Sequence, residues 1–178
     1  MLSQINLKSI SLVFLIILVS LLQVAIMPYF SFGQAIGNLI LIFLIIFIFK
    51  KEYQKALIWV IVGGFILDLS LGIGFGIYII PLAIIFVALF IFQEKILEID
   101  IYIFILGATL VASILLDILT ILMLYVYRQD LVIFSFWGIL LKQAAINTII
   151  MAIIYPIYYY FENKFYPERK IKLPESSI

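Results

Sequence analysis

The sequence predicts an all-α integral membrane protein with six transmembrane helices. Of its 178 residues, 67% are hydrophobic and only 12% are charged, which is more apolar surface than a water-soluble chain of this size can bury. Several apolar runs in succession approach or exceed the roughly 18 residues that a helix needs to cross the hydrocarbon core. Because these runs lack strict alternation, they favour spanning helices over a barrel.

Charged residues, glycines and prolines divide the chain into six apolar segments. The second is short, about 20 Å if wholly helical, whereas the fifth and sixth exceed a bilayer thickness. Pro81 falls within the fourth segment and predicts a bend there. We expect one membrane domain over residues 1–166 and a polar, disordered tail over 167–178. The six segments are 9–29, 36–49, 56–71, 76–92, 101–127 and 136–161.

The distribution of charge predicts the orientation of the chain. The net charge is +1, from 11 Lys plus Arg against 10 Asp plus Glu, so no basic excess indicates a nucleic-acid partner. With both termini in the cytoplasm, Arg128 is left outside and Lys142 lies within a helix. The aromatic residues that end the sixth segment are typical of a membrane interface, and the basic tail is placed to touch membrane lipids. The cytoplasmic basic residues are then Lys8, Lys50, Lys51, Lys55, Lys95, Lys164, Arg169, Lys170 and Lys172.

The residue inventory disfavours an enzyme. The chain has no Cys and no His, which excludes disulfides, thiolate nucleophiles and imidazole bases. Two acidic residues in separate helices lack the clustering that a Mg²⁺ site requires. We therefore expect no catalytic centre, no cofactor and no metal.

Three charged residues fall inside the apolar segments, where each costs on the order of 2.5–3.5 kcal/mol. These are Asp68, Asp117 and Lys142, and all three lie in the outer halves of their helices. We expect Lys142 to pair with Asp117 or with Asp68. The pair has three interpretations: an ion pair that fixes helix packing, a contact for a partner or a conformational change, or a group that transfers protons or substrate.

Uncharged polar residues also interrupt the apolar segments. Gln143 and Asn147 are four positions apart and share one helix face. Hydrogen bonds between helices, worth roughly 0.6 kcal/mol each, account for them, for Asn38 and for Thr148. Contacts to a substrate are the alternative.

Around Asp68 an apolar helix runs into a glycine-rich turn. Its spacing is Gly64-x-x-x-Asp68-x-x-x-Gly72-x-x-x-Gly76. Glycines permit tight backbone turns and close helix approach. No soluble strand precedes the glycines and no Lys-Ser/Thr follows them, so this is not a phosphate-binding loop. We expect a short, tightly packed outer loop.

This spacing resembles the Gly-x-x-x-Asp and Gly-x-x-x-Gly pattern of the MreD family of bacterial shape-determining proteins. The size of the chain, its six hydrophobic segments and the Asn38-Leu39 pair that opens the second span are similar to that family as well. Members of the family often carry Pro before this pair, whereas this chain has Gly37.

The resemblance implies a non-enzymatic, multi-pass subunit of the bacterial inner (cytoplasmic) membrane. Such a subunit belongs to the rod complex, or elongasome, where it binds MreC and helps organise lateral peptidoglycan synthesis and cell shape. MreB, RodA and a class B penicillin-binding protein are the other expected members. In this interpretation Gly64, Asp68, Gly72 and Gly76 form a packed turn that shapes the outer surface or binds a partner.

The alternative is a substrate-binding subunit of an energy-coupling-factor vitamin transporter, because the MreD family is similar to those subunits in helix arrangement. They typically carry an Ala-x-x-x-Ala coupling motif in the first helix. Here that spacing occurs between Ala108 and Ala112, in the fifth segment, which disfavours the transporter.

Overall fold

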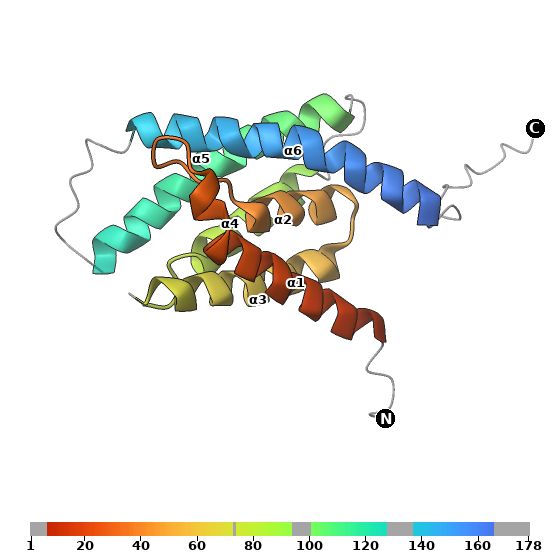
Figure 1. Ribbon diagram of the computed structural model, residues 1–178, viewed down its shortest axis with the longest axis horizontal. Helices are drawn as coiled ribbons and strands as arrows, with labels where there is room; N and C mark the ends of the chain where they lie inside the picture. The colour runs from red at the N-terminus through yellow and green to blue at the C-terminus, as the bar shows by residue number, and fades with distance from the viewer. Residues whose placement is uncertain (1–6, 73, 94–100, 128–136, 166–178) are drawn as a thin grey trace, which may run out of the picture.

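The computed structural model describes residues 7–72, 74–93, 101–127 and 137–165, which form one helical bundle (Figure 1). Its described part is all-α, and an isolated bridge between Phe32 and Ala35 is its one β feature. The predicted tail 167–178, Lys95, Arg128 and the side chain of Lys8 lie outside the described residues. The helices are α1 (Leu7–Ala25), the 3₁₀ helix η1 (Met27–Phe30), α2 (Leu39–Phe49), α3 (Tyr53–Leu71), α4 (Ile79–Gln93), α5 (Ile101–Tyr127) and α6 (Trp137–Phe165).

Within the described residues, three helices are long and apolar enough to cross a membrane. They contain the stretches Tyr53–Ser70, Tyr102–Tyr127 and Gly138–Glu162. Shorter apolar stretches of 10–17 residues occur in α1, α2 and α4. The all-α class and the membrane character predicted from the sequence are confirmed, whereas six spans with two cytoplasmic termini stay a prediction.

α2 is the centre of the bundle (Figure 1). It contacts each of the other α-helices, and around it α1, α3, α4, α5 and α6 touch in that order. The described Cα atoms of α1 and α6 stay more than 8 Å apart, so the ring is open between these two helices. Eight of the 11 residues of α2 are buried, as expected of a helix that is apolar on every side. α2 is about 16 Å long, in agreement with the short second apolar segment of the sequence.

One end of the bundle, which we name the lysine end, carries Lys50, Lys51, Lys55 and Lys164. Here Lys50 follows α2, and its ammonium group forms an ion pair with the Glu162 carboxylate of α6. The same ammonium lies 4.9 Å from the ring centroid of Tyr159, a cation–π distance. These contacts tie the end of the central helix to the end of α6, close to where the sequence predicts an aromatic interface.

The opposite end, which we name the glycine end, carries Gly33, Gly37, Gly72, Gly74 and Gly76. The segment between α1 and α2 and the turn between α3 and α4 both lie here. At the turn between α3 and α4, the hydroxyl of Tyr127, the last residue of α5, donates a hydrogen bond of 2.7 Å to the Phe75 carbonyl. α1 begins and α6 ends at the lysine end (Figure 1).

The bend predicted at Pro81 assumed that this proline would interrupt a helical hydrogen bond, and the structure does not place it where it could. Pro81 is the third residue of α4, and backbone N–H groups in a first turn have no partner within the helix. Its missing N–H therefore breaks no helical hydrogen bond. Pro156 is the proline that lies inside a helix, in α6.

The ion pair at the lysine end predicts that replacing Lys50 destabilises the protein more than replacing Lys55 does. In Lys50→Met we expect the free energy of unfolding to fall by roughly 1.5–3 kcal/mol, the usual worth of a hydrogen bond to a charged group. Lys55→Met is the matched control, because this side chain is 43% exposed and its partner Glu52 is only three positions away. It should lose less than about 0.5 kcal/mol. Thermal unfolding in detergent measures both, and equal losses would contradict the assignment.

Candidate functional site

The Asp68 side chain caps the start of the next helix. It is 2% exposed and lies near the end of α3. Its Oδ2 accepts a hydrogen bond of 2.7 Å from the Gly76 amide, and its Oδ1 accepts one of 2.6 Å from the Tyr78 amide. A carboxylate at a helix N-terminus is favoured both by these amides and by the helix dipole. One side chain of α3 therefore fixes the entry into α4.

The three glycines of the motif allow the same hairpin. A Cβ on Gly64 would lie 3.0 Å from the Cα of Ile79, so its absence lets α3 approach the start of α4. Gly72 ends α3 in the left-handed conformation, at φ +63°, and Gly76 has φ +97°. Both conformations favour glycine. Gly64, Asp68, Gly72 and Gly76 thus build one packed turn.

A second group of hydrogen bonds lies where α2 begins, in the interior of the bundle. The chain reaches this point through a tight turn that is closed by the bridge between Phe32 and Ala35, and Ala35 is fully buried. The side-chain amide of Gln23, in α1, bonds backbone groups on both sides of Asn38, at the start of α2. Its Nε2 donates to the Gly37 carbonyl over 2.8 Å, and its Oε1 accepts from the Leu39 amide over 2.7 Å. The role of Gln23 was not predicted from the sequence, although Gln23 is a strongly polar residue near the end of an apolar helix.

Asn38 and Asn147 complete this entry. The Asn38 amide donates a hydrogen bond of 2.6 Å to Asn147 Oδ1. The Asn38 side chain is the N-cap of α2, accepting from the Leu41 amide over 3.0 Å. Both asparagines are at least 96% buried. Gly37 packs so closely here that a Cβ would lie 2.3 Å from Ile150 Cδ1, which explains why a bulkier residue is absent at this position.

Two polar contacts, one helical turn apart, join α5 to α6. Asn147 Nδ2 donates to Ser113 Oγ over 3.1 Å, and Gln143 Nε2 donates to Asp117 Oδ1 over 2.9 Å. Gln143 and Asn147 therefore share the face of α6 that meets α5, as predicted. Thr148 instead donates to the Ala144 carbonyl of its own helix, and among the described residues it makes no hydrogen bond to another helix.

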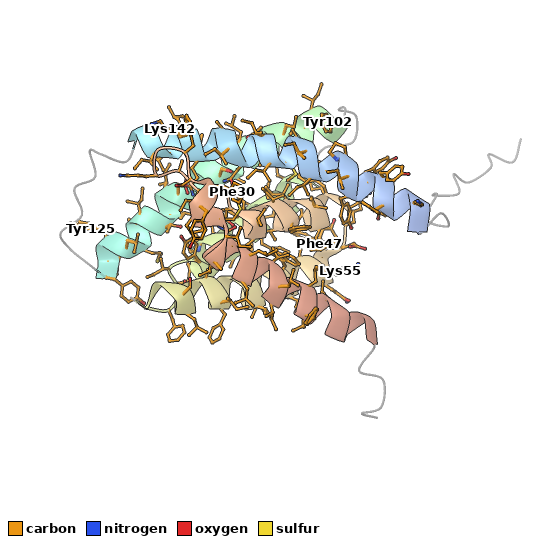
Figure 2. All side chains as sticks on the ribbon, viewed as in Figure 1. Phe30, Phe47, Lys55, Tyr102, Tyr125 and Lys142 are labelled. Atoms are coloured by element: carbon orange, nitrogen blue, oxygen red, sulfur yellow. The ribbon has the colours of Figure 1, made fainter. Side chains whose placement is uncertain are left out.

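The predicted pairing of Lys142 with Asp68 or Asp117 is wrong. Both Asp68 oxygens accept backbone hydrogen bonds, and no described ion pair involves Lys142. Successive helical positions point about 100° apart, so Lys142 turns away when Gln143 faces α5. Its Nζ lies 3.3 Å from where a Cβ on Gly33 would be, beside the segment that precedes α2 (Figure 2). Asp117 Oδ2 is buried with no partner among the described residues.

A cleft of about 250 Å³ opens at the glycine end. We name it the glycine-end cleft. Side chains from α1, α3, α6, η1 and the two connecting segments line it, and six of the ten lining residues are polar. Clefts between helices of a bundle are common sites for small molecules. The lining residues are Gln23, Val24, Pro28, Gln34, Ile36, Asn38, Leu67, Ser70, Tyr78 and Gln143.

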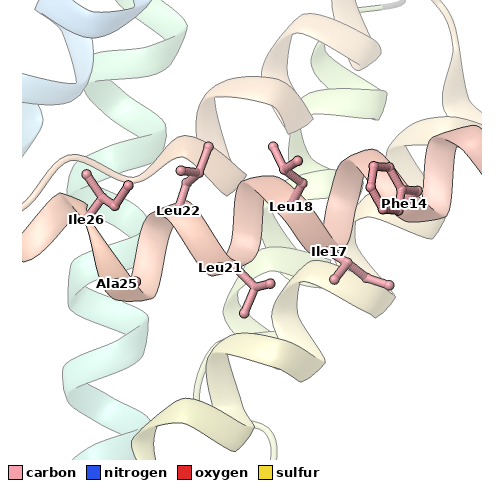
Figure 3. Close-up of a pocket in the computed structure, with 7 residues that line it drawn as sticks. All are labelled: Phe14, Ile17, Leu18, Leu21, Leu22, Ala25 and Ile26. Carbon is pink, nitrogen blue, oxygen red and sulfur yellow. The ribbon is translucent and has the colours of Figure 1, made fainter.

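A second hollow, of about 280 Å³, lies on the apolar surface of α1. Among the described residues its lining comes from α1 and the residue that follows it, as Figure 3 shows. Leu18 and Leu22 point to one side of the helix, and Ile17 and Leu21 point to the other (Figure 3). Phe14 is 66% exposed and Leu21 is 57% exposed. This surface, which we name the α1 groove, has no cover from the described residues of this chain.

No protein-family model, curated protein or solved structure matches the chain.

The buried hydrogen bonds at the start of α2 predict that substitutions at two neighbouring residues of α6 lower the free energy of unfolding by different amounts. Asn147→Leu removes the acceptor of the Asn38 amide, and we expect it to cost roughly 1–3 kcal/mol, as a buried unpaired N–H does. Thr148→Val is the matched control, because the described hydrogen bond of Thr148 is to its own helix, and it should cost less than about 0.5 kcal/mol. Thermal unfolding in detergent compares the two. An unchanged unfolding temperature for Asn147→Leu would show that another group satisfies this amide.

Proposed function

We propose that the chain is a non-enzymatic, six-span subunit of the bacterial inner membrane, with both termini in the cytoplasm. In this proposal it belongs to the rod complex, or elongasome, and binds MreC. Through that contact it helps organise lateral peptidoglycan synthesis and cell shape, together with MreB, RodA and a class B penicillin-binding protein. Its role is to hold partners by contact.

The observation that carries the proposal is the hairpin around Asp68. The resemblance to the MreD family rests on Gly64, Asp68, Gly72 and Gly76, four positions that are separate in the sequence. In the structure each has a part in one turn, with the Asp68 carboxylate between the two helices. A motif whose members act together supports a shared fold at this place more strongly than four isolated matches do.

The α1 groove supports a role in holding a partner. α1 touches α2, α3 and η1, and it leaves the ring open on the side of α6. An exposed, continuous apolar helix face inside a membrane can pack against lipid or against another helix. We take the α1 groove to be the contact for a transmembrane helix of the partner, with lipid in its place when the chain is alone.

Partner recovery tests this proposal. Tagged chain is purified from its native membrane in mild detergent, and what accompanies it is identified by mass spectrometry. In Asp68→Asn, an NH₂ donor replaces one of the two oxygens that accept hydrogen bonds from backbone amides. We therefore expect the turn to loosen and MreC recovery to fall about tenfold, equivalent to about 1.4 kcal/mol. Asp117→Asn is the matched control, since its remaining oxygen still accepts from Gln143, and it should recover the same partners as wild type.

A folding control separates loss of binding from loss of stability. Asn147→Leu destabilises the bundle without touching the turn, so its recovery per folded molecule should stay near that of wild type. Full recovery of MreC by Asp68→Asn would remove the turn from partner binding. Recovery of transporter ATPases together with a vitamin would replace the proposal with the transporter subunit.

A further inference from the structure

Hydrogen-bonding groups in the glycine-end cleft are left without partners. Asn38 is 4% exposed, and its Oδ1 is held by the Leu41 amide, so Nδ2 is the free end of this carboxamide. Gln143 uses Nε2 on Asp117, which leaves its Oε1. Among the described residues, neither of these atoms nor the Tyr78 hydroxyl has a hydrogen-bond partner. A few polar groups in an otherwise apolar cleft are what orients a small ligand, so these are placed to bind one.

The electrostatics of the cleft disfavour anions. None of its described lining residues carries a charge. Two carboxylates stand directly behind the lining: Asp68 binds the Tyr78 amide, and Asp117 binds Gln143. The ammonium of Lys142 lies over Gly33, outside the lining set. A negatively charged ligand would enter a site that offers it no cation and is backed by two negative groups.

Size and composition narrow the ligand further. The volume of about 250 Å³ lies below the range of roughly 300–1,000 Å³ of drug-sized ligand sites, so it suits a single ring with one substituent. The free groups are donors on Asn38 and Tyr78 and an acceptor on Gln143, beside the carboxamide of Gln34. Carboxamides pair with molecules that present a donor next to an acceptor. Val24, Pro28, Ile36 and Leu67 supply apolar walls.

We propose that the glycine-end cleft binds a small uncharged molecule that carries an amide, either as a substituent or within its ring. Asn38 and Tyr78 donate to its carbonyl oxygen, and Gln143 accepts from its N–H. This goes beyond the role in holding partners, which needs no ligand. The α1 groove and the cleft are different surfaces, so failure of the ligand site leaves the partner-binding proposal to its own test.

The absence of cysteine makes a direct test possible. Both Ser70 and Ser31 are exposed at this end, but only Ser70 is among the described residues that line the cleft, so Ser70→Cys places a thiol at the cleft and Ser31→Cys places one outside it. Each variant, purified in lipid nanodiscs, is alkylated with N-ethylmaleimide in the presence of nicotinamide, uracil or the anionic analogue nicotinate. With a Kd of about 1 mM, 10 mM nicotinamide or uracil should slow alkylation of Ser70→Cys about tenfold. Nicotinate should change it by less than about twofold, and Ser31→Cys should respond to none of the three.

A second variant tests the assigned donor. Tyr78→Phe, added to Ser70→Cys, removes the free hydroxyl and keeps the backbone bond to Asp68, so protection by nicotinamide should fall at least about threefold. Tyr127→Phe removes a hydroxyl at the same end but outside the cleft and should leave protection unchanged. Four results would each overturn the proposal: no alkylation of Ser70→Cys, no protection by nicotinamide or uracil, equal protection by nicotinate, or full protection in Tyr78→Phe.

Discussion

The start of α2 inside the bundle is the constraint on which the other helices depend. An apolar environment offers no water to the backbone groups at a helix N-terminus, so each must find a partner within the protein. Gln23 of α1 and Asn147 of α6 supply those partners from the two sides of the open ring. The described Cα atoms of α1 and α6 stay more than 8 Å apart, yet both helices are bound to this one short stretch of backbone. The positions of the two outer helices are therefore set by the hydrogen bonds of the central one.

The turn between α3 and α4 meets the same requirement with a charge. A carboxylate is costly to bury, but it accepts from two amides at once and lies at the positive end of a helix. Asp68 does both, which explains why an acidic residue is found in an apolar segment without a basic partner. Asp117 has one described hydrogen bond, from Gln143, and one oxygen with no described partner. The two intramembrane acids thus differ in kind: one completes a turn, and the other borders the cleft.

The sequence predicted those features that follow from hydropathy and spacing. Long apolar runs located the helices to within a few residues, and the four-residue spacing of Gln143 and Asn147 placed both on one face. Contacts that depend on the direction of individual side chains were not predictable. Lys142 was expected to neutralise a carboxylate because opposite charges attract, but both Asp68 oxygens were already bound by backbone amides. Gln23 was overlooked because a single amide in an apolar helix does not reveal that its partner is a buried backbone segment far along the chain.

The two ends of the bundle differ in the charged and polar groups that they carry, although each end has polar atoms without a described partner, such as Gln93 Oε1 at the lysine end. At the lysine end the ammonium of Lys50 is bound by Glu162 and lies over aromatic rings, so it holds helices together. At the glycine end the chain turns through left-handed glycines and leaves a cleft in which an amide donor, an amide acceptor and a hydroxyl group lack partners among the described residues. Among the described residues, neither helix packing nor turn formation uses Asn38 Nδ2 or Gln143 Oε1. The glycine end is therefore where the described chain presents polar groups that its own fold does not use, and where the proposed ligand would bind.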